Sequence, residues 1–362
     1  MRTDSSAWTA SGASRTASSS STRSATWKST SLSTWPRAAS ATRTSWTRAR
    51  QRQPQEVTMP EFESLSDRIG ARVHGVNLSR GLDEESWRAI EAAWNERHLL
   101  VFPGQAELPV DAQVALLARF GPVLEERVPG EKHSWVSNAD GHGTDEMNDG
   151  YREGPLTAHM DYTYTPYPAD VISLWAEQLP ETGSETVFYS NVAPLETMPA
   201  DLRAKLSGYH VFCAHDLAAM KPDARLYLEG RTDPTAPTQS YTWPLIRRHP
   251  HKPGIEALVC TLQQTERIVE LSDEAAGDAA SRAMLGRIFD EHLYTDANRY
   301  VHGWRPGDLV VWDNVALQHA RDACPRVVGA RVLRRVAVCE AGNAIHDTVA
   351  FLGLQDSSVA FS

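Results

Sequence analysis

Three candidate metal ligands stand out in the sequence. His159 and Asp161 lie two residues apart, and His319 lies far downstream. In extended backbone, residues two apart project to the same side, so His159 and Asp161 can bind one ion together. Two imidazoles and one carboxylate on one face of an ion leave the opposite face open, which is the arrangement of non-heme Fe(II) oxygenases. The same residue types also occur in zinc hydrolases and in purely structural pairs. The choice between these three interpretations therefore depends on residues elsewhere in the chain.

A second feature is a pair of arginines, Arg331 and Arg335, in an apolar segment at 331–338. On a strand, Arg331, Leu333 and Arg335 share one face. Arginines that point into a core are costly unless each meets an anion. The spacing therefore predicts that each arginine meets an anion inside the fold. For Arg335 this anion is either a bound ligand or a buried acidic side chain of the protein itself.

The apolar pattern predicts the elements that position these residues. Helices are expected at 83–97, 111–120, 199–206 and 273–292, and strands at 69–78, 99–102, 135–138, 171–176, 185–190, 258–262, 300–304, 309–312 and 331–338. Strands and helices do not alternate regularly, and there is no glycine-rich phosphate loop, which argues against Rossmann and TIM folds. We predict a mainly β fold with flanking helices, a double-stranded β-helix (jelly roll, cupin-like).

Two polar segments interrupt this pattern. Residues 139–155, just before the first ligand, are rich in Gly, Asp, Asn and Glu and form either a lid over a site or an ordinary surface loop. Residues 216–240 are polar and proline-rich, which predicts a large insertion or loop. The helix at 273–292 is either a packing element or part of an oligomer surface, and we expect a homo-oligomer (dimer or tetramer).

The chain divides by composition at residue 58. Residues 1–58 are rich in Ser, Thr, Ala and Arg and have no apolar periodicity, which predicts a disordered low-complexity extension. This extension resembles a transit peptide, or else reflects a start codon assigned too far upstream, with Met59 as the true start. Residues 59–362 are predicted to form a single jelly-roll dioxygenase domain.

Composition also narrows the range of partners and compartments. The net charge of −10 gives no reason to expect a nucleic-acid partner. No apolar run approaches the roughly 18 residues of a membrane span. The four cysteines are widely spaced, without a C-x-x-C, and are expected to be reduced thiols in a cytoplasmic enzyme.

Several motifs together resemble one family. They lie at 70–78, 100–105, 159–161, 185–186, 265–269, 304–308, 312–314, His319, Arg331 and Arg335. With them, essentially the whole of 64–340 resembles the taurine / 2,4-dichlorophenoxyacetate (TauD/TfdA-type) dioxygenases, which use Fe(II), 2-oxoglutarate and O2.

The resemblance implies a role for each candidate. His159, Asp161 and His319 would bind the metal and form the catalytic centre. Thr186 and Arg331 would bind the distal carboxylate of 2-oxoglutarate, because a planar guanidinium meets a carboxylate with two hydrogen bonds. Arg335 would bind an acidic group of a small, anionic organic substrate, and Tyr162, next to the motif, would line its pocket.

The resemblance also implies the reaction. It is the hydroxylation of a substrate carbon, with release of succinate and CO2. Desaturation, cyclisation or oxidative dealkylation at the same site, or a binding protein without turnover, remain alternatives. A zinc hydrolase would leave Thr186 and Arg331 without a role.

Overall fold

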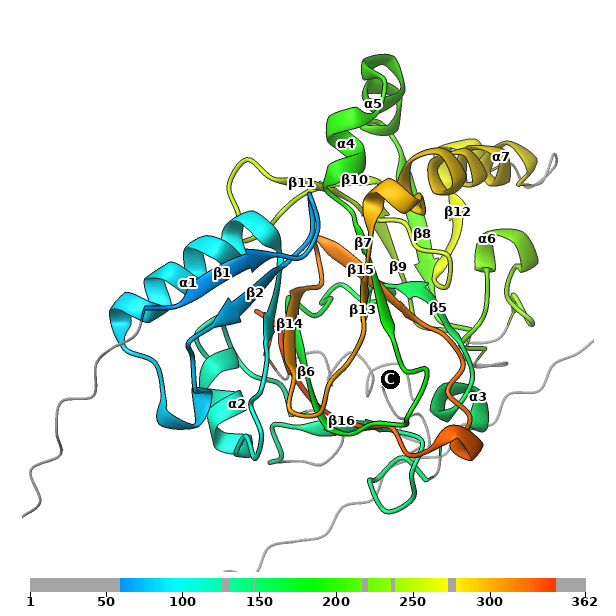
Figure 1. The fold of residues 1–362 in the computed structure, drawn as a ribbon. Coiled ribbons are helices and arrows are strands. Elements are labelled where there is room, and N and C mark those ends of the chain that lie inside the picture. The colour runs from blue at the N-terminus through cyan, green and yellow to red at the C-terminus, as the bar shows by residue number, and fades with distance from the viewer. Residues whose placement is uncertain are drawn as a thin grey trace, which may run out of the picture. The chain divides into compact units, whose positions relative to one another are not determined.

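Two β-sheets face each other and enclose the core that contains the candidate ligands (Figure 1). The computed structural model of the chain describes residues 59–125, 130–145, 147–216, 221–235, 238–272 and 278–342. The predicted extension at 1–58 lies outside these residues. In the described part of the chain, the two sheets remain separate and do not close into a barrel.

The larger sheet has seven strands in the order β1-β2-β3-β14-β6-β16-β4. These strands are β1 (Glu61–Ser64), β2 (Ala71–His74), β3 (Leu99–Phe102), β14 (Leu309–Asp313), β6 (Val171–Gln178), β16 (Val332–Val338) and β4 (Ser134–Ser137). The smaller sheet has the order β13-β7-β15-β5, formed by β13 (Arg299–His302), β7 (Thr186–Ser190), β15 (Leu317–Arg321) and β5 (Leu156–His159). All neighbours in both sheets are antiparallel except β2 and β3.

Alternation along the central strands explains the layers. On β14, Val310 and Trp312 face the core between the two sheets, whereas Leu309 and Val311 face the opposite side. That opposite side is covered by α1 (Glu84–Arg97) and α2 (Val110–Leu117) (Figure 1). A strand buried on both faces is apolar along its length, as β14 is from Leu309 to Trp312, before it ends at the buried Asp313.

Helix α1 begins and ends where its sequence predicts. The side chain of Asp83 accepts a hydrogen bond from the backbone N–H of Ser86 at 2.7 Å, which caps the first turn. The helix ends at His98, whose φ of 61° is left-handed. Trp87 and Trp94 then pack on Phe120, beyond α2, with ring centroids 5.2 and 4.7 Å apart.

The residues between β7 and β13 in the sequence form an additional layer. It contains a three-stranded sheet of β12 (Thr265–Ile268), β8 (His210–Ala214) and β9 (Ser240–Pro244), and a two-stranded sheet of β10 (Ile246–Arg248) and β11 (Glu256–Leu258). Its helices are α4 (Ala193–Thr197), α5 (Ala200–Leu206), α6 (Leu226–Glu229) and α7 (Ala279–Ile288), and its separate core includes Trp243, Leu258 and Phe289.

Three predicted elements differ from the structure. The strand predicted at 69–78 is shorter, because β2 ends at His74 and Leu78 begins a 3-10 helix (Leu78–Arg80). The strand predicted at 258–262 is wrong, because β11 ends at Leu258 and the following apolar residues are buried in the core of the additional layer without a sheet partner. The helix predicted at 273–292 begins at Ala279 in the described residues and changes to a π-helix at Phe289–Leu293. No helix among the described residues is long and apolar enough to cross a membrane.

Candidate active site

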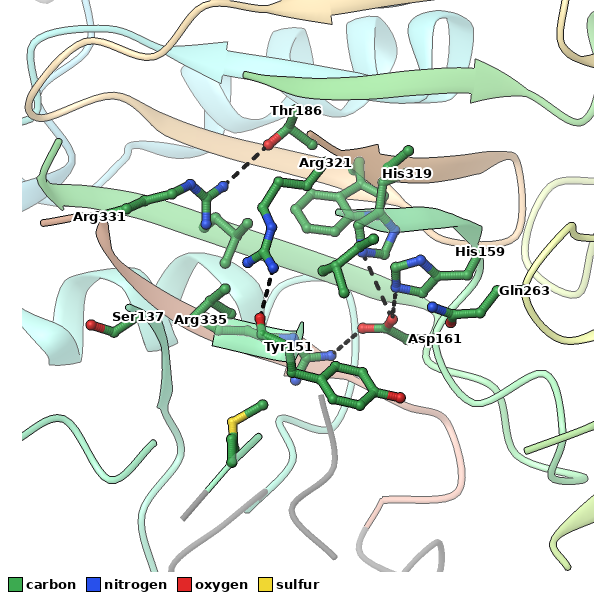
Figure 2. Close-up of a pocket in the computed structure, with 16 residues that line it drawn as sticks. Ser137, Tyr151, His159, Asp161, Thr186, Gln263, His319, Arg321, Arg331 and Arg335 are labelled. Atoms are coloured by element: carbon green, nitrogen blue, oxygen red, sulfur yellow. Dashed lines mark hydrogen bonds and ion pairs between the residues drawn. The ribbon is translucent and has the colours of Figure 1, made fainter. Parts of the chain in front are cut away.

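Two neighbouring strands bring the predicted metal ligands together. His159 is the last residue of β5, and His319 lies directly opposite it on β15. The Nε2 atoms of His159 and His319 lie 3.3 and 3.8 Å from Oδ1 of Asp161. One ligand atom from each residue lies within 4.8 Å of the others (Figure 2). The structure therefore confirms that these three residues converge.

The hydrogen bonds of the trio fit a bound cation. Nδ1 of His159 is 2.8 Å from the carbonyl oxygen of Thr157, and because a carbonyl only accepts, Nδ1 carries the proton. Nε2 is then the nitrogen of His159 available to a metal, and it lies on the side of Asp161, whose buried Oδ1 has no hydrogen-bond partner in the described part of the chain. Burial and, to a smaller extent, the neighbouring His159 together lower the pKa of His319 to about 3, against the opposing effect of Asp161. Unprotonated nitrogens and an orphaned carboxylate oxygen are what a divalent metal requires.

Asn314 holds Asp161 in place through the backbone. Its Oδ1 accepts the N–H of Asp161 at 3.0 Å, and its Nδ2 donates to the carbonyls of Asp161 and Ala169 at 3.2 and 2.8 Å. All three groups are buried, so the amide replaces the water they lose on folding. Asn314, the last residue of the predicted motif at 312–314, therefore positions the backbone of the predicted metal ligand Asp161.

Asp313 fixes the turn between β14 and β15. Its Oδ1 accepts the N–H groups of Val315 and Ala316, each at 3.0 Å. Its Oδ2 meets Nζ of Lys252 at 2.8 Å and Nε2 of His249 at 2.9 Å. Burial favours the neutral acid, but these two groups overcome it and hold the pKa of Asp313 far below its ordinary range. The strand that carries His319 thus starts from a rigid turn.

The predicted co-substrate residues lie together at another part of the cavity. Oγ1 of Thr186 accepts a hydrogen bond from the indole Nε1 of Trp304 at 3.0 Å, and Nη2 of Arg331 lies 3.5 Å from it. Arg331 is buried, and its Nε has no hydrogen-bond partner among the described residues. Burial lowers the pKa of Arg331 to about 9, and the charge of Arg321 adds to this effect, but Arg331 still carries a proton at pH 7.

The predicted substrate residue Arg335 forms an ion pair with a predicted metal ligand. Its Nη2 lies 2.7 Å from Oδ2 of Asp161 (Figure 2). Arg331 and Arg335 both line the cavity, and Leu333 faces the core between the sheets, so the alternation predicted from the sequence is confirmed. Arg335 therefore has the acidic partner that the sequence left open, and this acid is itself part of the metal site.

The cavity around these residues has one apolar and one cationic part. Its apolar side chains are Val136, Met147, Leu156, Leu174 and Trp312, and its polar ones are Ser137, Tyr151, His159, Asp161, Thr186, Gln263, His319, Arg321, Arg331 and Arg335, with Ala320 completing the wall. Asp161 is the only acidic side chain among these lining residues. Three guanidinium groups are thus opposed by one carboxylate.

The segment at 139–155 covers this cavity. It contributes Met147 and Tyr151 to the lining, and α3 (Asp149–Arg152) lies within it. The segment is bound to the connection between β15 and β16, where Arg326 pairs with Asp149 at 3.3 Å and Glu153 at 2.5 Å. Met147 and Tyr151 thus place part of this segment against the cavity, as the lid interpretation requires, and the lid itself stays a prediction.

Arg321 and Gln263 are two of the polar cavity residues that the sequence analysis did not predict. Arg321 follows His319 by two positions, so the even spacing along a strand would have revealed it had β15 been predicted as a strand. Gln263 lies near His159 and Asp161 (Figure 2), in a turn that carries no recognisable sequence signal.

Tyr162, by contrast, is not on the cavity wall. A left-handed backbone with φ of 64° directs its ring into the core between the sheets, where 3% of the residue is exposed. The guanidinium of Arg335 lies 6.0 Å from the centre of this ring. The geometry gives no support to the prediction that Tyr162 contacts substrate and places it among the packing residues.

Comparison with known proteins gives consistent matches. The model of the "Taurine catabolism dioxygenase TauD, TfdA family" matches residues 61–337. An (S)-phenoxypropionate/alpha-ketoglutarate-dioxygenase of Delftia acidovorans is 32% identical over 275 residues, covering 69% of this chain and 85% of the relative. Pentalenolactone F synthase of Streptomyces arenae is 28% identical over 274 residues, covering 70% and 87% of the two chains.

The fold is also found in solved structures. A taurine dioxygenase from Burkholderia xenovorans superposes with a TM-score of 0.60 at 23% sequence identity, over 78% of this chain and 91% of that chain. The prediction of a mainly β jelly roll with flanking helices is confirmed.

Proposed function

Since the chain belongs to the taurine catabolism dioxygenase (TauD, TfdA) family, and is an Fe(II)- and 2-oxoglutarate-dependent dioxygenase of small organic molecules, we propose that it hydroxylates an organic anion. In this proposal His159, Asp161 and His319 bind Fe(II), and Thr186 and Arg331 bind the distal carboxylate of 2-oxoglutarate. Bound Fe(II), 2-oxoglutarate and O2 together supply the oxidising chemistry, with succinate and CO2 as the co-products.

The chain's own residues would orient the reactants. Through its carbonyl, Thr157 would keep Nε2 of His159 directed at the bound metal, and Asn314 would keep Asp161 in place to bind the same ion. A guanidinium and a hydroxyl, from Arg331 and Thr186, offer N–H and O–H donors to one carboxylate. The apolar side chains that line the same cavity would exclude water from the substrate carbon.

The charge of the cavity carries the proposal of an anionic substrate. Arg321, Arg331 and Arg335 are each at most 5% exposed, and Asp161 is the one carboxylate among the lining side chains. A divalent metal raises the positive charge further, and the two carboxylates of 2-oxoglutarate offset only part of it. Buried charges require compensation, so a second organic anion is favoured in the remaining space.

Arg335 is the proposed contact for the acidic group of that substrate. Its ion pair with Asp161 leaves it on the cavity wall, beside the metal site. Phenoxypropionate, named in one relative, is itself a carboxylate, which supports a carboxylate as the first class to test.

An anaerobic titration tests the proposal. Apo-protein receives Fe(II) and then 2-oxoglutarate, and visible absorption is recorded. A charge-transfer band that requires both additions, and that shifts with small carboxylates or sulfonates, is expected. Product analysis of the anions that shift the band then separates hydroxylation from desaturation, cyclisation and dealkylation. If only neutral molecules shift the band, the anionic substrate is excluded.

The predicted homo-oligomer and cytoplasmic location stay predictions. Light scattering of the purified protein would measure the oligomeric state directly, and a monomer across the working concentration range would exclude the predicted dimer or tetramer.

A further inference from the structure

Arg321 lines the cavity but has no role in the proposal above. It lies on β15 two residues after His319, so both side chains project from the same face of the strand. In the register of the smaller sheet, Arg321 is directly opposite Thr186 on β7. Cross-strand partners have Cβ atoms about 4.5–5.5 Å apart, so Arg321 lies beside the predicted co-substrate residue.

The contacts of Arg321 occupy only part of its guanidinium. Nη2 donates to the backbone carbonyls of Tyr151 and Gly154 at 2.7 and 2.8 Å, at the end of α3. Nε is buried and has no hydrogen-bond partner among the described residues. The residue is 5% exposed, so bulk water does not compensate its charge.

The position of the guanidinium indicates what kind of partner it lacks. Figure 2 shows Arg321 between Arg331 and the imidazoles of His159 and His319. Two buried cations that flank the same space repel each other until an anion enters. Asp161 already pairs with Arg335, so the cavity lining offers Arg321 no carboxylate of its own.

We propose that Arg321 is a second cationic contact for the distal carboxylate of 2-oxoglutarate, and that it connects this carboxylate to the end of α3. This rests on the proposed function, because it takes 2-oxoglutarate as the ligand held by Arg331 and Thr186. The guanidinium donates to the carboxylate on one side and to the carbonyls of Tyr151 and Gly154 on another. Co-substrate binding therefore stabilises the covering segment through Arg321.

Calorimetric titration of Mn(II)-loaded protein tests the contact without turnover. Two probes are compared: 2-oxoglutarate, and oxalate, which chelates metal ions but has no distal carboxylate. A charge-assisted hydrogen bond predicts that Arg321→Met weakens 2-oxoglutarate binding about 10-fold to 100-fold. Oxalate binding should change by less than about 3-fold.

A merely structural role would give a different result. If Arg321 only holds α3, Arg321→Met weakens both probes equally or neither, and either outcome overturns the proposal. Arg326→Met is the matched control, because Arg326 binds the same covering segment at Asp149 and Glu153 but does not line the cavity. It should leave 2-oxoglutarate affinity within about 2-fold of the wild type.

Two further measurements keep the proposal testable. If Arg321→Met does not fold, Arg321→Lys retains the charge and should bind 2-oxoglutarate more weakly than the wild type but bind oxalate normally. In the wild type, 2-oxoglutarate should slow amide hydrogen exchange at 151–154 more than oxalate does, and equal protection overturns the coupling. If the wild-type protein binds no 2-oxoglutarate, the proposed function is contradicted. If Arg331→Met weakens 2-oxoglutarate binding and Arg321→Met does not, the proposed function is supported and the role of Arg321 is overturned.

Discussion

Arg335 and Asp161 form a buried ion pair, with Nη2 of the arginine 2.7 Å from Oδ2 of the aspartate. The other oxygen of the same carboxylate faces the two imidazoles. One carboxylate is thus shared between the proposed metal and the proposed substrate anchor. An anion bound by Arg335 and a cation bound by Asp161 would each change the charge that the other partner experiences.

Arg335→Gln should weaken substrate binding selectively. Loss of a charge-assisted contact predicts a rise in substrate KM of about 10-fold to 100-fold, with 2-oxoglutarate KM within about 3-fold. The neighbouring Arg334 is the matched control, since it lies on the opposite face of β16, bonded to Gln113 and Leu108. Arg334→Met should cost about 1–3 kcal/mol of stability and leave substrate KM unchanged. Equal substrate KM in wild type and Arg335→Gln would contradict the anchor.

His319→Gln should remove most of the metal affinity. The residue supplies one of three converging ligand atoms, so a loss of at least about 100-fold in Mn(II) or Fe(II) affinity is expected. His302→Gln is the control, because His302 is also buried in the smaller sheet but lies outside the cavity lining. Comparable metal affinity in both variants would place the metal elsewhere.

Trp304→Phe should weaken 2-oxoglutarate without affecting the substrate. Thr186 accepts from Trp304 and lies near a donor of Arg331, so its own proton is left to donate into the cavity. Removing the indole N–H frees the hydroxyl to rotate, and a rise of a few-fold in 2-oxoglutarate KM is expected. Thr186→Val, which removes the hydroxyl itself, should raise it by about 10-fold. A larger effect of Trp304→Phe than of Thr186→Val would indicate that the tryptophan acts by packing.

Stability should fall as the pH falls from 6.5 to 4. Burial and, to a smaller extent, the charge of Lys252, whose Nζ lies 2.9 Å from Nδ1, together lower the pKa of His98 to about 4. In the unfolded chain, His98 binds a proton near pH 6.5, whereas in the folded chain it does so only near pH 4. The free energy of unfolding is therefore unaffected by His98 above pH 6.5 and falls by about 3 kcal/mol as the pH drops to 4. His98→Asn keeps an acceptor for Lys252 and tolerates the left-handed backbone. Its unfolding free energy, from denaturant titration, should vary less with pH than that of the wild type, and parallel curves would contradict the assignment.

The apolar strands of the larger sheet could be predicted from the sequence, and several of the others could not. Strands such as β3 and β14 are buried on both faces and stand out as apolar runs. β15 contains the polar residues Gln318, His319 and Arg321, of which His319 and Arg321 line the cavity, and it therefore lacks that signal. The apolar residues after Leu258 led to the opposite error, the prediction of a strand that is absent. Burial alone does not distinguish a strand from an irregular core segment.

The site residues followed the same division. Ligands and arginines with fixed spacing, such as His159, Asp161 and Arg331, could be recognised from residue type. Arg321 and Gln263 could not, because their importance comes from strand register and from a turn that only the folded chain defines. Tyr162 was misplaced because adjacency to the motif says nothing about the direction that a left-handed residue gives its side chain.

Asn314 binds the backbone of Asp161 from 153 positions further along the chain. During translation, the first two ligands therefore leave the ribosome well before the residues that fix and complete their site. At about 5–20 residues per second, this delay is on the order of ten seconds or more. A nascent chain that ends before β15 lacks one of the three proposed ligands, so truncation before β15 is expected to abolish iron binding even where the N-terminal half of the sequence is intact.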